Sequence, residues 1–286
     1  MSAPSLFSLL VSRWAPSSPV LVMSVASVGL YALGVRRAGP RWPVRRTASF
    51  LGGIGCVVLA LQSGIDAFDD RMLSVHMVQH MLLLLVAPPL LLGGRPLILA
   101  LRALPPHRRS SLAKAVHSAR AATAPVPAVA IFGAAVVLTH LPAFYDATLR
   151  HAALHDCEHA VYLLAGLLMW SPLLDADPAP GRRLGGLGKL AYLIVAMLPM
   201  ALVGAYLNRH ATLVYSAYGP PARALGISAL DDQAQAGAIM WVVGNTIMVA
   251  VGLWAAIAAM VAQERRQIAR DSRGASLAAG DGGPAA

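Results

Sequence analysis

The stretch from Met72 to Gly94 constrains this chain most, because it is apolar enough to cross a membrane and yet carries two histidines. A helix of about 20 residues spans the hydrocarbon core of a bilayer. His76 and His80 are four residues apart, so on such a helix they lie one above the other on the same face. An imidazole in hydrocarbon needs a hydrogen-bond partner or a metal, so placing two of them there is costly. We therefore expect the rest of the chain to enclose this pair.

The composition sets the fold class. Apolar residues make up 57% of the 286 residues and charged residues only 13%, which excludes an ordinary soluble domain. We predict an all-α polytopic membrane protein, a bundle of seven transmembrane helices. The spans are expected at about residues 19–34, 47–65, 72–94, 126–141, 152–174, 190–207 and 233–262.

Two segments fall outside these spans. Residues 1–262 are predicted to form a single transmembrane domain and residues 263–286 a mostly disordered cytoplasmic tail. The basic connection over residues 95–124 suits an amphipathic helix on the membrane surface or a solvated loop, and the sequence leaves both open.

The basic residues orient the bundle. The net charge of +10 does not indicate a nucleic-acid partner, because the basic residues sit between apolar runs. With seven spans, 18 of the 23 Lys and Arg residues fall on one side of the membrane. The positive-inside rule makes that side cytoplasmic. The N-terminus is then outside and the C-terminus inside, and seven of the nine histidines fall on the outer side or at outer helix ends.

A second histidine cluster begins the fifth span. His155, Glu158 and His159 share one helix face, and His151 precedes them by one turn on nearly the same line. Two imidazoles and a carboxylate on one face are typical of a zinc, copper or iron site. We expect the third and fifth spans to pack side by side, with the two pairs facing each other. The alternative interpretation is a hydrogen-bond network of His and Asp that pins helix ends.

Other polar residues fall at the same end of the predicted bundle. His140 and Asp146 suit further ligands, or partners that orient imidazole N–H groups. Asp232, next to Gln233, is either a cap of the seventh helix or a wall of the same pocket.

Four blocks of the sequence resemble the CtaG (caa3-type) family of bacterial cytochrome c oxidase assembly factors: SVHMVQHMLLLLVAPPLLLGGRPL, THLPAFYDATL, LHDCEHAVYLLAGLLMWSPLL and DDQAQAGAIMW. The resemblance covers roughly residues 63–254 in matching order. Residues 63–66 depart from the pattern, which favours proline at the second place. The matching polar positions are Asp66, His76, His80, His140, Asp146, His155, Glu158, His159, Asp232 and Gln233.

The resemblance implies a non-enzymatic, multi-pass protein of the bacterial plasma membrane that handles or delivers copper for the oxidase. Its partners would be oxidase subunits and an extracytoplasmic copper chaperone. On this interpretation the metal ligands are drawn from His76, His80, His155, His159, Glu158, His140 and Asp66, with Asp146, His151, Asp232 and Gln233 around them.

Two other classes stay open. His155, Glu158 and His159 match an inverted zincin pattern, in which a glutamate activates a zinc-bound water. That chemistry leaves His76 and His80 unexplained. One histidine from each pair would also suit the axial ligands of a haem in a membrane electron carrier.

Overall fold

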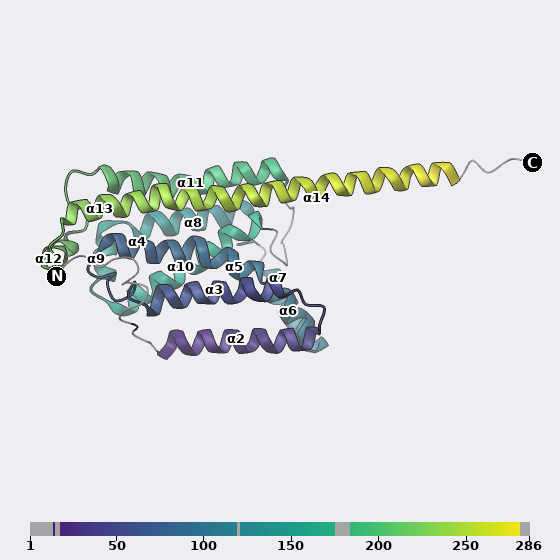
Figure 1. Cartoon of the computed structure of the whole chain (residues 1–286), viewed down its shortest axis with the longest axis horizontal. Coiled ribbons are helices and arrows are strands. Elements are labelled where there is room, and N and C mark those ends of the chain that lie inside the picture. The colour runs from purple at the N-terminus through teal and green to yellow at the C-terminus, as the bar shows by residue number, and fades with distance from the viewer. Residues whose placement is uncertain (1–13, 15–17, 119–120, 175–183, 281–286) are drawn as a thin grey trace, which may run out of the picture.

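The computed structural model describes residue 14 and residues 18–118, 121–174 and 184–280, and every regular element within these ranges is a helix (Figure 1). Two segments, η1 and η3, are π-helical, and η2 is a 3-10 turn. The elements are α2 (Ser18–Ala38), α3 (Val44–Gln62), α4 (Leu73–Met81), η1 (Leu82–Val86), α5 (Ala87–Gly93), α6 (Pro96–Ala103), α7 (Pro106–Ser118), α8 (Pro125–Thr139), α9 (Pro142–Thr148), α10 (Ala152–Leu173), α11 (Gly186–Arg209), η2 (Ser216–Tyr218), α12 (Gly219–Ala224), α13 (Ala229–Ala238), η3 (Ile239–Gly244) and α14 (Asn245–Gly280).

The all-helical, polytopic class is confirmed. Among the described residues, five helical stretches are long and apolar enough to cross a membrane, and a sixth is added if α8 and α9, bent by 77°, form one span. The helix α10 is not in this set, because its first two turns carry acidic residues and histidines. The structure thus supports five or six spans by length and composition, and the number seven stays a prediction.

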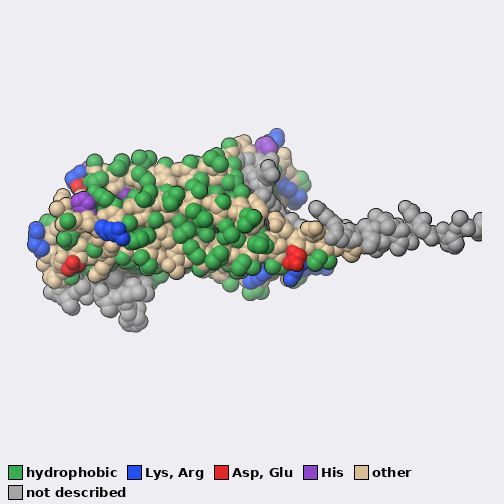
Figure 2. Space-filling model, turned by 90° about the horizontal axis from the view of Figure 1, so that it is seen from above, with side chains coloured by type: hydrophobic (Ala, Val, Ile, Leu, Met, Phe, Trp, Pro, Cys, Tyr) green, Lys and Arg blue, Asp and Glu red, His purple; other side chains and the backbone are tan. Residues whose placement is uncertain are grey.

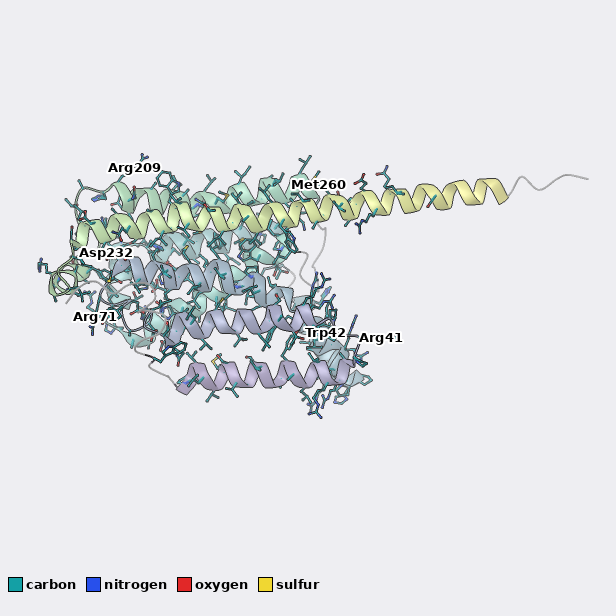
Figure 3. The ribbon with its side chains drawn as sticks, viewed as in Figure 1. Arg41, Trp42, Arg71, Arg209, Asp232 and Met260 are labelled. Carbon is teal, nitrogen blue, oxygen red and sulfur yellow. The ribbon has the colours of Figure 1, made fainter. Side chains whose placement is uncertain are left out.

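The outer surface of the bundle suits lipid. Large apolar side chains such as Met23, Leu30 and Leu202 are about 70% exposed, and Figure 2 shows hydrophobic side chains spread over the middle of the molecule. Soluble proteins rarely expose apolar patches of this extent. Charged side chains gather at the two ends: Arg71 and Arg209 lie at one end and Arg41 at the other (Figure 3).

The helix formed by α4, η1 and α5 runs between α3, α10 and α13, with α2 outermost against α3 and α6 (Figure 1). This helix contains Pro88 and Pro89 and changes to π-helical geometry directly before them. Proline has no amide hydrogen and clashes with the carbonyl four residues earlier, so it disrupts the regular helical ladder. The π-helical η1 lies directly before these prolines, and the carbonyl of Leu84 accepts a hydrogen bond of 3.3 Å from the Trp170 indole on α10.

The same carbonyl marks the closest approach of α10 to this helix. A Cβ atom on Gly166 would lie 2.4 Å from the oxygen of Leu84 and 2.7 Å from Cγ of Pro88. Only glycine fits there, since real side chains essentially never come so close. Gly166 and the freed carbonyl therefore set how near α10 comes to the helix that carries His76 and His80.

The segments around the core differ in how they pack. The connection over residues 95–124 forms two helices: α6 packs against α2 with Leu99 buried, whereas α7 buries no residue. The helix α14 continues to Gly280, beyond the predicted domain boundary at Ala262, and residues 281–286 of the predicted tail lie outside the described residues. The division of the chain into domain and tail stays a prediction.

Gly166→Ala should destabilise the bundle. The added methyl group meets backbone and a proline ring, neither of which moves without displacing a helix, and overpacking of this kind costs about 1–3 kcal/mol. The measurement is the thermal unfolding midpoint of the purified protein in detergent. Gly55→Ala is the matched control, because its Cβ meets nothing within 4 Å. Equal midpoints for the two variants would contradict the proposed close approach.

Candidate metal centre

Four histidines from two helices meet near one end of the bundle. His76 and His80 lie fully buried on α4, and His155 and His159 lie on the first two turns of α10. The Nε2 atoms of His76 and His155 are 3.4 Å apart, and the rings of His80 and His159 have centroids 6.1 Å apart. Metal–nitrogen bonds of about 2.0–2.1 Å place two nitrogens of one coordination sphere roughly 3–4 Å apart. The two pairs thus face each other with spacing that suits a metal ion.

Within the described residues, three overlapping triads offer ligand atoms that all lie within 4.8 Å of one another. They are His76, His80 and His159; Asp69, His155 and His159; and His76, His155 and Glu158. Because the triads share members, they form one cluster and not three separate sites.

The protonation of His76 follows from its neighbours. The hydroxyl of Tyr218 donates to the backbone carbonyl of Asp69 at 2.8 Å, so it has no hydrogen left for His76. Nδ1 of His76 lies 2.7 Å from that hydroxyl oxygen and must therefore be the donor. This leaves the lone pair on Nε2 of His76, the atom that faces His155.

A parallel argument applies to His159. The side-chain amide of Gln79 donates through Nε2 to the carbonyl of Ala60 at 3.0 Å and to Oδ1 of Asp66 at 3.2 Å. Its oxygen, Oε1, lies 3.1 Å from Nε2 of His159 and accepts a hydrogen bond there. The lone pair of His159 is then on Nδ1. Outer partners of this kind commonly orient metal-binding imidazoles.

His80 has no such partner. Both of its ring nitrogens are buried and lack a hydrogen bond to any described residue. Its ring packs against those of His76 and Tyr162, with centroids 4.2 Å away in each case. An unsatisfied buried polar group costs about 1–3 kcal/mol. A metal ion bound through one of these nitrogens would remove the part of the cost that belongs to its lone pair.

His140 is a neighbour of His80 at the edge of the cluster. Its Nδ1 donates to the carbonyl of Val136 at 2.7 Å, and its buried Nε2 has no hydrogen-bond partner in the part of the chain that the structure describes. The rings of His80 and His140 have centroids 6.3 Å apart. His140 therefore borders the cluster, although it belongs to none of the three triads.

Carboxyl groups border the other side. Burial, followed by repulsion from Asp66 and Asp70, raises the pKa of Asp69 to about 8. Burial likewise raises the pKa of Asp66 to about 6. Oδ2 of Asp69 lies 3.8 Å from Nε2 of His155. A carboxylate that water solvates poorly is stabilised by a nearby cation, so this edge of the cluster favours a positive ion.

Glu158 adds a carboxylate from α10 itself. The residue is 1% exposed, and neither of its side-chain oxygens has a hydrogen-bond partner among the described residues. Burying an unpaired carboxylate is costly, and a metal or a proton removes the cost. Together with His80, Glu158 supplies donor atoms that the protein leaves unsatisfied, and these atoms fit a bound metal ion.

The other predicted residues surround the cluster. Asp232 does not cap its own helix, where Ser228 is the N-cap. Its carboxylate accepts from the backbone amides of Leu73 at 2.6 Å and Ser74 at 3.3 Å, so it caps α4, the helix of His76 and His80. Gln233 bonds to the backbone of Val214 at 2.7 Å and of Thr212 at 3.1 Å, and thereby holds the loop that leads to Tyr218.

The remaining two predicted residues lie apart from the three triads. Asp146 has one buried oxygen that finds no hydrogen-bond partner in the described ranges of the chain. His151 is exposed at the N-cap of α10.

Three residues of the cluster were not among the predicted site residues. Gln79 was detectable, because it lies three residues after His76 on the same helix face. Asp69 is only one of several acidic residues between the second and third predicted spans, so the sequence does not single it out. Tyr218 carries no signal in the sequence, since it reaches His76 from a loop 142 residues further along.

Asp232→Ala should weaken the start of α4. Loss of an N-cap carboxylate typically costs about 0.5–2 kcal/mol, and here it would also loosen the helix turn that carries His76. We expect a lower unfolding midpoint and weaker metal binding in the purified protein. Asp231→Ala, at the exposed neighbouring residue, is the control and should change neither quantity. Equal effects of both variants would exclude a specific capping role.

Comparison with known proteins identifies the family of this chain. The sequence profile of the Caa3_CtaG family, described as cytochrome c oxidase caa3 assembly factor, matches residues 29–262. The uncharacterized protein Mb0105 of Mycobacterium bovis is 31% identical over 265 residues, which cover 87% of this chain and 39% of that protein. The uncharacterized protein ML1998 of Mycobacterium leprae is 30% identical over 249 residues, covering 84% and 38%.

The chain thus spans about two fifths of the length of the curated relatives that it matches. No solved structure matches it. The family profile, by contrast, covers most of the chain and all four facing histidines. This chain belongs to the family of cytochrome c oxidase caa3 assembly factors.

Proposed function

We propose that this protein assists oxidase assembly by binding copper at the histidine cluster and passing it on, with no catalytic step of its own. The observation that supports this most strongly is the approach of His76 and His155, whose Nε2 atoms are 3.4 Å apart. Beside them, the ring nitrogens of His80 have no hydrogen-bond partner among the described residues. Imidazole-rich sites suit copper and zinc alike. The role of the family in oxidase assembly favours copper, which is here cargo and not a resident cofactor.

The exposure of the ligands suggests an access route. The side chain of His155 is 18% exposed and that of Asp69 is 6% exposed, whereas His76 and His80 are fully buried. An arriving ion would meet Asp69, His155 and His159 first, and would reach His76 and His80 by exchanging ligands one at a time. Because His159 belongs to both the outer and the inner triad, the ion keeps one ligand during this exchange.

The geometry favours copper over haem. Axial ligands of a haem stand on opposite faces of a flat macrocycle and are separated by it. The rings of His76 and His155 have centroids 5.0 Å apart and are inclined at 63°, and those of His76 and His80 are 4.2 Å apart. No space for a porphyrin separates them.

The membrane arrangement completes the proposal. Adding α8 with α9 and α10 to the five apolar stretches gives seven spans, with the cluster at the outer, less basic end. Oxidase subunits and an extracytoplasmic copper chaperone would then approach from the side where His155 is exposed. Of the basic residues behind this orientation, Arg13, Arg120, Arg182 and Arg183 lie outside the described residues.

Metal binding tests the proposal directly. The purified protein should bind about one copper ion per chain by elemental analysis after exposure to excess copper and desalting. His80→Ala and His159→Ala should lower the bound copper at least tenfold, and should also lower active oxidase in membranes while leaving the amount of inserted protein unchanged. His151→Ala is the matched control, because this histidine is exposed. Unchanged copper binding in His80→Ala would overturn the proposed site.

A membrane zinc hydrolase is the second candidate, favoured by the Glu158 carboxylate within ligand distance of His76 and His155. Hydrolysis needs Glu158 as the general base for a metal-bound water. Glu158→Gln would then abolish activity, whereas His76→Ala would change little. Under the copper proposal His76→Ala lowers oxidase activity at least as much as Glu158→Gln, because His76 supplies a ligand nitrogen and Glu158 a ligand oxygen. Oxidase activity of the two variants in membranes distinguishes the two functions.

The proposed orientation predicts which reporters are active. A fusion after Arg270 should be active with a cytoplasmic reporter, and a fusion after Tyr218 with a reporter that works only outside the cytoplasm. The reason is the excess of basic residues at one end of the bundle. An externally located Arg270 would place the histidine cluster on the cytoplasmic side and would remove the proposed external copper donor.

A further inference from the structure

Methionines are unusually frequent in the buried core of the bundle. Six of the eleven methionines belong to one cluster of buried apolar residues, to which leucine contributes only seven members. Leucine fills nearly the same volume and has better-defined rotamers, so it is the more usual core residue. Five of these methionines come from α4, α11 and the continuous helix of α13, η3 and α14, and each is at most 5% exposed. We call them the methionine group: Met77, Met81, Met200, Met240 and Met248.

Gly244 marks the point where the three helices of this group meet. A Cβ atom on Gly244 of η3 would lie 3.0 Å from Sδ of Met81 on α4 and 2.6 Å from Cε of Met200 on α11. The missing side chain of Gly244 thus makes room for both thioether side chains at one point. Met240 and Met248 lie four residues before and four residues after Gly244, so they share nearly the same helix face. Thioethers from three helices are therefore neighbours here.

Each of the three helices departs from regular α-helical geometry at this level. The π-helical η1 begins directly after Met81, and the π-helical η3 contains Met240 and ends at Gly244. In α11, Pro199 lies inside the helix directly before Met200, and proline removes a hydrogen bond from the helical ladder. Helical irregularities of the π type are frequent at functional sites. Three irregular helices, each with a buried methionine at the irregularity, favour a binding role over packing alone.

The chemistry of thioethers narrows the choice of ligand to soft metal ions. Methionine sulfur selects Cu(I), whereas imidazole suits copper and zinc more generally. The cost of moving an ion from water into a core of low polarity rises with the square of its charge, so a divalent ion costs far more than a monovalent one. Thioethers carry no charge that would offset this cost. The methionine group therefore suits a soft monovalent ion.

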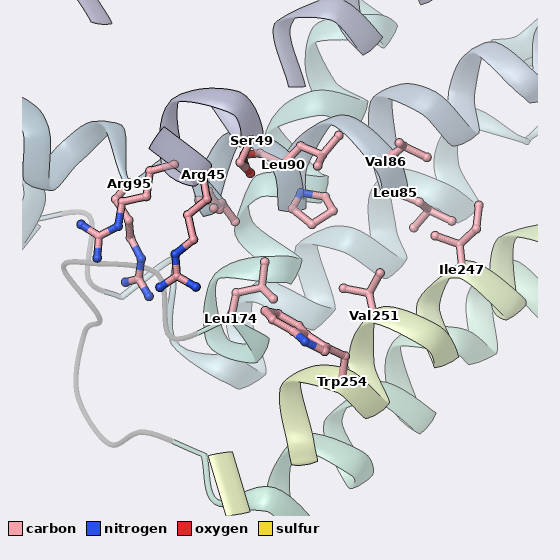
Figure 4. A pocket seen from close by; sticks show the side chains of 14 residues that line it. Arg45, Ser49, Leu85, Val86, Leu90, Arg95, Leu174, Ile247, Val251 and Trp254 are labelled. Atoms are coloured by element: carbon pink, nitrogen blue, oxygen red, sulfur yellow. Dashed lines mark hydrogen bonds between the residues drawn. The ribbon is translucent and has the colours of Figure 1, made fainter. Parts of the chain in front are cut away.

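A cavity beside the methionine group provides space for the side chains to rearrange. It lies between α3, α5 and α14 and has a volume of about 530 Å³ (Figure 4). Leu85 of η1 and Ile247 of α14 line this cavity and lie next to each other in Figure 4. Cδ1 of Leu85 is also 3.4 Å from the Cβ position of Gly244. Leu85 can thus move toward the cavity when an ion binds between Met81 and Met200, whose unbranched side chains adapt readily.

We propose that Met81, Met200 and Met240 form a second metal site, which binds one Cu(I) ion through their thioether sulfurs. The site shares no ligand with the histidine cluster, so the proposal does not depend on copper binding there. Without a reductant copper is divalent, and the thioether site then stays empty. It therefore adds nothing to the one copper ion per chain that the histidine cluster is proposed to hold. The protein would hold the two oxidation states of copper at separate places.

The test uses the full chain purified in mild detergent and carrying both His80→Ala and His159→Ala, so that the histidine cluster is disabled. Ag(I) is the probe, because it is soft, monovalent and stable in one oxidation state. Bound silver is counted by elemental analysis after equilibrium dialysis. We expect one Ag(I) per chain, and one Cu(I) per chain when copper is kept reduced with ascorbate. Absence of Ag(I) binding would overturn this proposal and would leave the proposed histidine site unaffected.

Variants locate the ion. Changing Met81, Met200 and Met240 to leucine conserves the volume of the core, so the triple variant should keep its unfolding midpoint and bind Ag(I) at least tenfold more weakly. Met23→Leu with Met260→Leu is the matched control, because these methionines are 70% and 51% exposed. Unchanged Ag(I) affinity in the triple variant would contradict the site.

Two further measurements complete the test. In the chain with intact histidines, the triple variant should bind Cu(II) as the parent does, and a loss of Cu(II) binding would contradict two separate sites. X-ray absorption of the silver-loaded parent should show sulfur neighbours, and nitrogen neighbours alone would overturn the proposal. If the triple variant does not fold, Met200→Leu alone decides, with an expected loss of at least threefold in Ag(I) affinity.

Discussion

Pro88 has no amide hydrogen, and the carbonyl of Leu84, four residues earlier, accepts instead from the indole of Trp170. This bond and the missing side chain of Gly166 let α10 approach the helix formed by α4 and α5 so closely that no other residue fits. Both helices begin at the same end of the bundle and carry their histidines in their first turns. A contact two to three turns further along therefore fixes how the two histidine pairs meet. The arrangement of the histidine cluster thus depends on a proline and a glycine that lie outside it.

Burial then decides what the cluster can bind. In surroundings of low polarity, the N–H group of each imidazole requires a hydrogen-bond acceptor, and its lone pair requires a hydrogen-bond donor or a metal. Tyr218 and Gln79 satisfy the N–H groups of His76 and His159 and leave one lone pair on each ring directed elsewhere. The ring nitrogens of His80 and the carboxylate oxygens of Glu158 accept or donate no hydrogen bond within the part of the chain that the structure describes. The protonation of His76 and His159 is thus fixed by their neighbours, and under the proposed function a cation bound at the cluster would stabilise the fold.

The sequence predicted the helices and the two histidine pairs because both follow from local spacing. Because an α-helix has 3.6 residues per turn, His76 and His80 lie on one helix face, and His155 and His159 lie on another, independently of tertiary structure. Tyr218 and the cap that Asp232 provides for α4 were beyond the sequence, since each joins segments more than 140 residues apart. The π-helical segments were missed for a related reason, because tertiary packing decides where a helix accommodates an extra residue in a turn.

Overlapping triads suit transfer better than storage. Any two of the triads share one histidine, which is His76, His155 or His159, and within each triad the ligand atoms lie within 4.8 Å of one another. Two cations bound to triads that share a histidine would be close neighbours and would repel each other strongly in surroundings that screen charge poorly. Under the proposed function, the cluster therefore holds one ion at a time, and that ion has alternative ligands on either side. A site built for permanent storage would instead offer one closed set of ligands with no donor atom left over.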